Sequence, residues 1–345
     1  METRMTQLFG IKYPLMLSGM NYVTTPTLVA AVSNAGGLGI LAGAAYTKDQ
    51  LRNAIREIRS LTEKPFGVNV TLYLPGAKDV VEVILEEKPP VINYALGKAT
   101  EIIKATHGWG GKVIGSVATT KHALRAVNDG VDALAVTGHE AAAHGGEVAS
   151  MVIIPAIASK AKVPVIAAGG FYNGRGLIAA LALGAAGISL GTRFAMTKES
   201  PVHDYYKKLM ASASEEDTMI TDRWDGLPGR LFKTESALDL VKKRGLGMDT
   251  LTSTLRMKRE LNLSWGELIA GSLRMKKVEQ LSLGKMVAIP VGFSMLKRAI
   301  FDGDKDGIML AGQNVGLIND VLTCQEVIDQ IMAEALKVKE EISKL

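Results

Sequence analysis

Short runs of Val, Ile and Leu alternate with amphipathic stretches from the N-terminus to Leu190, and this alternation restricts the fold more than any other feature. It is typical of a parallel sheet covered by helices. The predicted strands are 13–18, 38–41, 66–71, 91–94, 112–117, 133–137, 163–168 and 187–190. Regular spacing, with no isolated nucleotide fingerprint after the first strand, favours a closed (β/α)₈ TIM barrel over an open sheet.

The stretches between these strands have apolar residues at helical spacing, as at 47–60, 120–128 and 175–183. From residue 213 onward Met, Lys and Arg become frequent and strand-like runs disappear, which predicts a helical insertion or lid. A turn rich in Asp and Gly at 301–307 leads into the last helices. We therefore expect an α/β barrel domain from 1–212 and 296–345, with a smaller helical domain at 213–295.

The charge of the chain is uneven. The formal net charge is +5, and residues 213–300 hold 15 Lys and Arg against 11 Asp and Glu, which accounts for +4 of it. This excess indicates an anionic group near the segment, unless these residues form a solvated helical face. Only 5% of residues are aromatic and no nucleic-acid module is visible, so we expect no nucleic-acid partner.

Residues 1–11 show neither a signal peptide nor a transit segment, and no window reaches the roughly 18 apolar residues of a membrane helix. We therefore expect a cytoplasmic protein without a membrane partner. The chain has one cysteine, Cys324, which excludes an internal disulfide and argues against a Cys-rich zinc site and against thiol catalysis.

Glycine-rich sequences follow three of the predicted strands, and in a barrel all three would face the same rim. They are Ser18-Gly19-Met20, Ala168-Gly169-Gly170 and Gly191-Thr192-Arg193. Loops after the seventh and eighth strands that lack side chains let backbone N–H groups approach a phosphate. The alternative is that the glycines only form tight turns.

The loop after the sixth strand, residues 138–147, contains His139, Glu140, His144 and Glu147 among small residues. A histidine at this rim can exchange protons near neutral pH, so His144 is the candidate acid or base. A metal site and a structural histidine are the alternatives. The His-Glu-x-x-x-His spacing is one residue longer than the zinc-protease pattern, so we predict no metal.

Asn69 is a polar amide near the end of an otherwise apolar strand. A buried Asn needs hydrogen-bond partners, which a ligand or the neighbouring backbone could supply.

Together these motifs resemble the nitronate monooxygenase (formerly 2-nitropropane dioxygenase) family, which includes enoyl-acyl-carrier-protein reductase II and some NADH:quinone reductases. The similar segments occur in order at 13–16, 19–20, 34–39, 65–69, the His144 loop, 166–171, 191–194 and 311–313. The resemblance implies a barrel with a smaller helical domain, FMN as cofactor and, in several branches, NAD(P)H as electron donor.

By this resemblance, Gly19 and Met20 flank the flavin ring and Asn69 contacts the ring or the ribityl chain. Gly169, Gly170, Gly191 and Thr192 hold the phosphate, and His144 is the active-site histidine. The expected cofactor-binding set also includes Ser116, Thr137, Gly138 and Ala168. Relatives with nitronate or quinone activity tend to carry Lys in place of Ser116 and Asp in place of Thr137, so this chain lacks both charges.

Residues 223–228, Arg-Trp-Asp-Gly-Leu-Pro, resemble a branch that acts on coenzyme A thioesters in steroid-ring degradation. Arg and Lys pair with phosphates, so the basic segment suits such a ligand. The candidate substrate residues are His139, Arg256, Lys258, Arg274 and Gln313, with Arg259, Lys276 and Lys277 in the same basic set.

The leading hypothesis is an FMN-dependent oxidoreductase in which His144 assists proton transfer to or from a small-molecule substrate. Two substrate classes remain open, a nitronate and an enoyl- or acyl-CoA thioester used with NAD(P)H. A third hypothesis is a non-catalytic barrel that binds a phosphate ligand. The oligomeric state also stays open, with a homodimer among the alternatives.

Overall fold

The computed structural model describes residues 1–74, 76–242, 255, 266 and 283–344. Eight parallel strands pair in the order β1-β8-β7-β6-β5-β4-β3-β2. They are β1 (Leu15–Leu17), β2 (Gly39–Ala42), β3 (Phe66–Thr71), β4 (Val91–Ala95), β5 (Lys112–Val117), β6 (Ala133–Thr137), β7 (Val165–Ala168) and β8 (Gly187–Leu190). Leu17 N–H donates to Leu38 O and Leu38 N–H donates to Leu15 O, both at 2.9 Å, which joins β1 to the β2 side. The predicted barrel is confirmed.

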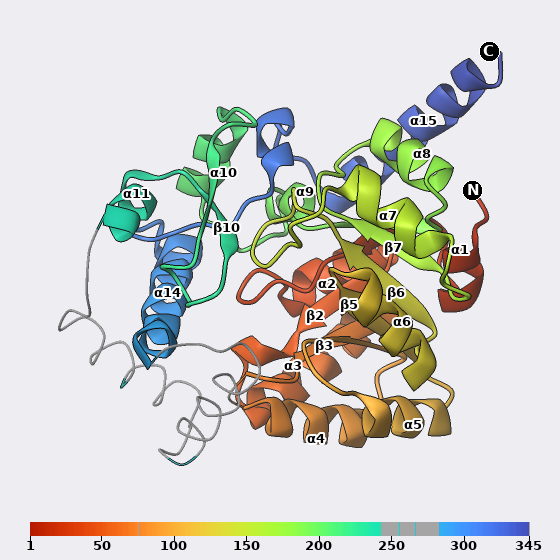
Figure 1. The fold of residues 1–345 in the computed structure, drawn as a ribbon, viewed down its shortest axis with the longest axis horizontal. Coiled ribbons are helices and arrows are strands. Elements are labelled where there is room, and N and C mark those ends of the chain that lie inside the picture. Colours follow the sequence, from red (N-terminus) through yellow and green to blue (C-terminus); the bar gives the residue numbers. More distant parts are fainter. Residues whose placement is uncertain (75, 243–254, 256–265, 267–282, 345) are drawn as a thin grey trace.

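Helices surround the strands (Figure 1). They are α2 (Pro26–Asn34), α3 (Lys48–Leu61), α4 (Ala77–Glu87), α5 (Thr100–Gly108), α6 (Thr120–Asp129), α7 (Ser150–Ala158), α8 (Gly174–Ala182) and α15 (Cys324–Ile342). Thr47 and Thr323 begin α3 and α15 with capping boxes, which satisfy N–H groups that the helices themselves cannot. The last helix, α15, packs against α8 and α2, so the C-terminal segment completes the helical layer beside β1 and β8.

Alternate residues along the strands enter two separate apolar clusters, as the two-residue period of a strand requires. Leu15 and Leu17 belong to the larger cluster between strands and helices, whereas Met16 belongs to the smaller one inside the barrel. The short helix α1 (Arg4–Phe9) adds Met5 and Phe9 to the inner cluster. A Cβ on Gly187, the first residue of β8, would overlap Met5 Sδ, so α1 packs directly against the N-terminal end of the barrel.

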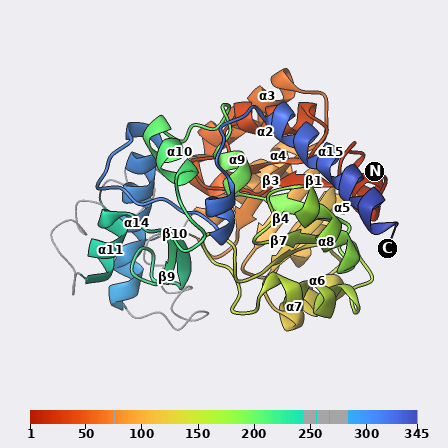
Figure 2. The same ribbon diagram turned by 90° about the horizontal axis from the view of Figure 1, so that it is seen from above.

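A second lobe lies beside the barrel, opposite both termini (Figures 1 and 2). It contains α10 (Asp204–Ala211), β9 (Thr218–Thr221), β10 (Gly229–Phe232), α11 (Glu235–Lys242) and α14 (Leu283–Asp302). Strands β9 and β10 pair antiparallel, so the prediction that strand-like runs end at residue 213 was wrong at these two strands. Each has only four residues and includes polar ones, so neither forms an apolar run like those of the barrel strands. Residue 296, the predicted domain boundary, lies inside α14.

In the part of the chain that the structure describes, no helix is both long enough and apolar enough to cross a membrane.

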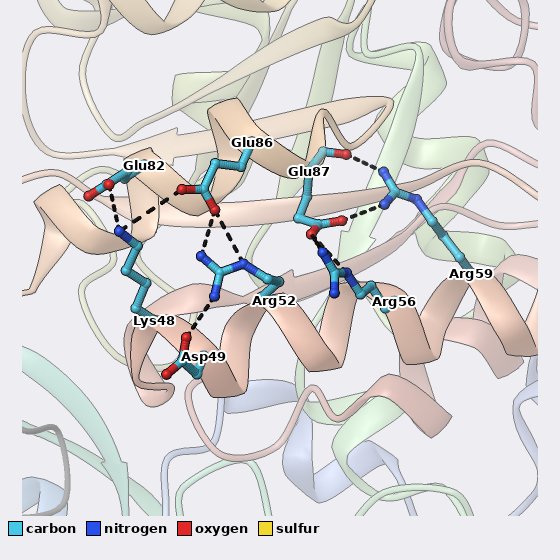
Figure 3. A network of polar contacts seen from close by, with 8 residues as sticks. All are labelled: Lys48, Asp49, Arg52, Arg56, Arg59, Glu82, Glu86 and Glu87. Atoms are coloured by element: carbon cyan, nitrogen blue, oxygen red, sulfur yellow. Dashed lines mark hydrogen bonds and ion pairs between the residues drawn. The ribbon is translucent and has the colours of Figure 1, made fainter.

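Ion pairs join α3 to α4 on the outside of the barrel (Figure 3). Arg52 contacts Glu86 at 2.6 Å, and Arg56 and Arg59 both contact Glu87 at 2.8 Å. The Glu87 side chain is only 8% exposed, so it is the member of this network that is most shielded from water. The network fixes how α4 lies on α3.

Candidate active site

A cavity of about 340 Å³ opens where the barrel strands end. This is the C-terminal rim, where TIM-barrel enzymes have their active sites. The predicted residues that line it are Gly19, Met20, Asn69, Ser116, Thr137, His144, Ala168, Gly169, Gly170, Gly191 and Thr192. Residues far apart in sequence are thus brought to one space, as the positions of the glycine-rich loops indicated.

Three other predicted residues lie outside the cavity lining: Gly138, His139 and Gln313. A Cβ on Gly138 would overlap Ser150, so this glycine serves close packing. The His139 ring contacts Gly146 O at 3.2 Å, and Gln313 N–H donates to Glu140 O at 3.0 Å. The basic candidates Arg256, Lys258, Arg259, Arg274, Lys276 and Lys277 lie outside the described residues.

The cavity floor is a chain of neutral polar groups on three adjacent strands. Asn69 Nδ2 donates to Asn93 Oδ1 at 2.8 Å, and Asn93 Nδ2 donates to Ser116 Oγ at 2.9 Å. Asn93 is buried and was missed in the sequence, although it interrupts an apolar strand just as Asn69 does. The network holds the Asn69 amide on β3 at the cavity surface, so the side-chain carbonyl and amide of this floor are oriented before any ligand binds.

At the rim near β7 and β8, the glycines of the two loops expose backbone that no side chain of their own covers. Gly169 and Gly170 have φ of 99° and 82°, a region that other residues rarely adopt. A Cβ on Gly191 would have no neighbour closer than Met20 Sδ at 3.6 Å, so the space in front of this backbone is open. Thr192 Oγ1 accepts from Gly312 N–H at 3.0 Å, which ties the loop after β8 to the returning chain. This bare backbone fits a phosphate group.

His144 is held by the second lobe. Its Nε2 lies 2.8 Å from Asp225 Oδ2, and its Nδ1 lies 3.1 Å from Pro228 O. The ring stacks on the indole of Trp224. The Asp225 side chain is 6% exposed and the His144 side chain 34%, so the carboxylate is buried behind a ring that reaches the cavity.

The backbone of the His144 loop is also bound to the hairpin that β9 and β10 form. Ala143 has a φ of 53°, unusual for a residue with a Cβ. Its N–H donates to Arg230 O at 3.2 Å, and Arg230 N–H donates to Ala143 O at 2.8 Å. A Cβ on Gly229 would lie 2.7 Å from Trp224 Nε1 and 3.3 Å from His144 Nδ1. Glycine at this position therefore allows the hairpin to pack closely on the histidine.

Glu140, weighed above as a metal ligand, has a packing role in the structure. Its carboxylate accepts from Ser150 N–H at 3.0 Å and from Ser150 Oγ at 2.8 Å, at the first residue of α7. This is a side-chain cap on a helix N-terminus. Glu140, His139 and His144 thus face three different sets of partners.

The outer wall of the cavity is apolar and comes from the second lobe and the returning chain. It is formed by Trp224, Leu227, Phe293, Leu296 and Met309. Among the described lining residues, the ionisable side chains are Tyr73, His144 and Asp225. The site therefore combines an uncharged polar floor, a side-chain-free rim and a single imidazole beneath an apolar cover. The sequence predicted that His144 lies at this rim, and it did not predict the apolar wall.

Known proteins with similar sequences indicate the family to which this architecture belongs. The family model described as nitronate monooxygenase matches residues 2–82 and 76–334. A relative from Rhodococcus jostii is 37% identical, covering 98% of this chain and 96% of its own, and is named (3aS,4S,5R,7aS)-5-hydroxy-7a-methyl-1-oxo-octahydro-1H-indene-4-carboxyl-CoA dehydrogenase. The protein of the same name from Mycobacterium tuberculosis is 36% identical, covering 97% of this chain and 96% of its own.

Among solved structures, FabK from Thermotoga maritima superposes with a TM-score of 0.81 at 36% identity, covering 100% of this chain and 99% of that one. The family match, the relatives and the solved structure agree with the barrel described above. The chain belongs to the nitronate monooxygenase family and is a flavin-dependent oxidoreductase.

Proposed function

We propose that this protein is an FMN-dependent oxidoreductase that acts on a coenzyme A thioester, with His144 as the group that transfers a proton. The observation that carries this proposal is the neutral floor of the cavity, formed by Asn69, Asn93 and Ser116 beneath an apolar wall. Such a site accommodates an uncharged carbonyl compound better than an anion.

FMN is the proposed form of the flavin. The loops at Gly169, Gly170, Gly191 and Thr192 provide one stretch of bare backbone, which suits a monophosphate. The chain shows no second nucleotide fingerprint of the kind that would favour FAD. When bound, FMN supplies the hydride or electron transfer, while the protein places the substrate and handles the proton.

The substrate class follows from two positions on the floor. Ser116 and Thr137 both line the cavity, so the Lys and Asp that nitronate- or quinone-active relatives tend to carry there would have faced the space that the flavin and the substrate share. Here both positions are uncharged. A nitronate is an anion and gains most from a fixed cation, whereas the carbonyl oxygen of a thioester needs only a hydrogen-bond or proton donor, which His144 can supply.

The relatives support the same class. The names of those from Rhodococcus jostii and Mycobacterium tuberculosis describe a dehydrogenase acting on a carboxyl-CoA compound. The basic candidates at 256–277 would bind the phosphates of coenzyme A, and NADH or NADPH is the proposed electron partner. The proposed compartment of the protein is the cytoplasm.

Nitronate oxidation is the second candidate, favoured by the match to the nitronate monooxygenase model over most of the chain. It requires that the neutral floor and His144, which is paired with Asp225, bind an anionic nitronate without a further fixed cation.

The deciding experiment is an anaerobic titration of the purified holoprotein, followed through the flavin absorbance. NADH and NADPH are tested as reductants, and a 2-enoyl-CoA is then added to the reduced protein to reoxidise it. A saturated acyl-CoA and propane 2-nitronate are tested on the oxidised protein. The matched control is the acyl pantetheine thioester, which lacks the nucleotide phosphates of coenzyme A.

We expect the flavin to exchange electrons with the coenzyme A thioester and to respond poorly to the nitronate. The Michaelis constant for the coenzyme A thioester should rise with salt, because exposed charge contacts are screened, and that for the pantetheine thioester should not. Rapid reduction by the nitronate with no response to any thioester would overturn the proposed substrate class.

A further inference from the structure

We propose that Asp225, on the turn between β9 and β10, is a positioning residue that orients His144 and keeps a proton on its Nε2. This inference rests on the proposed role of His144 and assigns a function to the second lobe. Asp225 itself acts through the imidazole and is not proposed to touch the reacting atoms.

The first argument concerns the hydrogen bonds of the ring. Pro228 O can only accept, and a carboxylate can only accept, yet Nδ1 and Nε2 of His144 lie 3.1 Å and 2.8 Å from these two groups. A neutral imidazole has one N–H and would leave one of the two contacts without a hydrogen. A ring that carries both protons donates to both oxygens, so this geometry favours the doubly protonated form.

The second argument concerns the buried carboxylate. Asp225 is 5% exposed, and a charge in such a place needs donors or a cation. Leu227 N–H donates to Oδ1 at 3.1 Å, and the His144 ring occupies Oδ2. Leu227 N–H therefore orients the carboxylate through Oδ1, and Oδ2 orients the imidazole.

The third argument is rigidity. Trp224 stacks on the imidazole, and Phe293 of α14 packs on Trp224 with ring centroids 5.9 Å apart. The paired hydrogen bonds between Ala143 and Arg230 hold the neighbouring backbone. With the ring fixed on its face and at Nε2, one orientation is selected before a substrate arrives, and Nδ1, whose contact with Pro228 O is the longer and exposed one, is the nitrogen that exchanges a proton with the substrate.

The test is Asp225→Asn, because the amide has nearly the same shape and can present an N–H where the carboxylate presents only oxygen. In FMN-loaded protein labelled with ¹⁵N-histidine, the Nε2 signal of His144, assigned by its loss in His144→Ala, should be that of a protonated nitrogen. In Asp225→Asn it should shift towards that of an unprotonated nitrogen, since the amide now donates to it. An unchanged signal would overturn the proposal.

The chain offers a matched control at the opposite end of the barrel. His107 Nε2 contacts Asp132 Oδ2 at 2.9 Å, and Asp132, which directly precedes β6, also accepts from Val113 N–H at 2.7 Å. Asp132→Asn breaks the same kind of pair away from the cavity. It should alter the His107 signal and leave the His144 signal and the turnover unchanged.

A second test compares the kinetics of single and double variants, so a loss of stability in Asp225→Asn alone does not decide it. Asp225→Asn should lower kcat by roughly 10²-fold with little change in KM, because an orienting carboxylate acts through the histidine. Introduced into His144→Ala, it should cause no further loss. Losses that multiply in the double variant would show that Asp225 acts independently of His144, and would overturn the proposal.

The two proposals fail in different ways. If no thioester exchanges electrons with the flavin, the proposed substrate class fails, and the ¹⁵N signals still decide the role of Asp225. If thioester turnover is found but Asp225→Asn changes neither the His144 signal nor kcat, the positioning role fails and the proposed function stands.

Discussion

The imidazole of His144 lies flat on the indole of Trp224, with ring centroids 5.4 Å apart and an interplanar angle of 12°. The histidine comes from the loop after β6, and the tryptophan from the hairpin 80 positions later in the chain. The barrel thus supplies the imidazole, and the second lobe supplies Trp224, Asp225 and Pro228, which contact it.

The first prediction concerns His144 itself. His144→Ala should lower the rate of the proton-coupled step by about 10²- to 10⁴-fold, the usual contribution of one acid or base, while flavin absorbance and thermal unfolding stay close to those of the wild type. Stopped-flow flavin kinetics measures this step. His139→Ala is the control, because His139 lies outside the cavity lining. Full loss in His139→Ala with normal turnover in His144→Ala would reverse the assignment.

The second prediction tests the phosphate position at Gly191. Its φ is −98° and a Cβ would have no neighbour within 3.5 Å, so both the backbone conformation and the space around Cβ admit a residue other than glycine. Gly191→Val should therefore fold normally and bind FMN more weakly, because the branch occupies the space of the phosphate. Mass spectrometry of the released cofactor identifies it and fluorescence titration gives the affinity. FMN affinity equal to that of the wild type would place the phosphate elsewhere.

Gly169 is a less selective test of the same loop. It has a positive φ and a Cβ would lie 3.0 Å from Ser150 Oγ, so Gly169→Val combines backbone strain with the loss of space. We expect reduced stability together with reduced FMN content.

The third prediction concerns Gly229. Gly229→Ala forces a methyl group against Trp224 Nε1 and His144 Nδ1, so the ring must move relative to Asp225. Turnover should fall while bound FMN is retained, because the glycine loops that hold the phosphate are on the barrel. The measurement compares kcat with the flavin-to-protein ratio. Loss of flavin together with activity would show that the hairpin supports the cofactor site as well.

The fourth prediction is a loss of stability at high pH. Burial raises the pKa of the Tyr46 and Tyr94 hydroxyls and of the Cys324 thiol to about 12 in each case. Their neutral forms are favoured in the folded state, so this stabilisation is complete below the ordinary values near 9 to 10 and is lost as pH rises towards 12.

Thermal unfolding measured at increasing pH should show the midpoint falling in that window. Below it, the Cys324 thiol should resist alkylation in the folded protein and react once the protein unfolds. Rapid labelling of native Cys324 at neutral pH would contradict its burial.

The fifth prediction uses the ion-pair network between α3 and α4. Glu87→Gln should lower the free energy of unfolding by about 1 kcal/mol, since one shielded carboxylate serves both Arg56 and Arg59. Glu340→Gln is the matched control, because Glu340 pairs with Lys344 where both side chains are about 70% exposed. Denaturant unfolding should separate the two variants at low salt and bring them together at high salt.

The strands of the barrel were predictable because each is a short apolar run between helical patterns. Strands β3, β5, β6 and β8 have the predicted bounds, and β1, β2, β4 and β7 differ from them by at most two residues at either end. The hairpin was not predictable, because its four-residue strands are stabilised by pairing with each other and by packing on the His144 loop. The strand propensity of a short stretch of sequence does not reflect such contacts.

The site residues likewise divide into those with a local signal in the sequence and those that depend on contacts between distant segments. The glycines and His144 follow predicted strands, so the topology alone brings them together. Asp225 and Trp224 depend on a contact between distant segments, and nothing local in the sequence indicates that Asp225 faces an imidazole. Asn93 had a local signal, a polar residue inside an apolar strand, and could have been found by the reasoning used for Asn69.

The return of the chain to the barrel at α15 has a consequence for synthesis of the protein. All eight strands precede residue 191, whereas α15, whose buried residues cover α8 and α2, begins at Cys324. A Cβ on Gly174 of α8 would overlap the α15 backbone, so the two helices fit together closely. During synthesis on the ribosome, the apolar surface of α8 and α2 therefore stays exposed to water and to chaperones until α15 emerges.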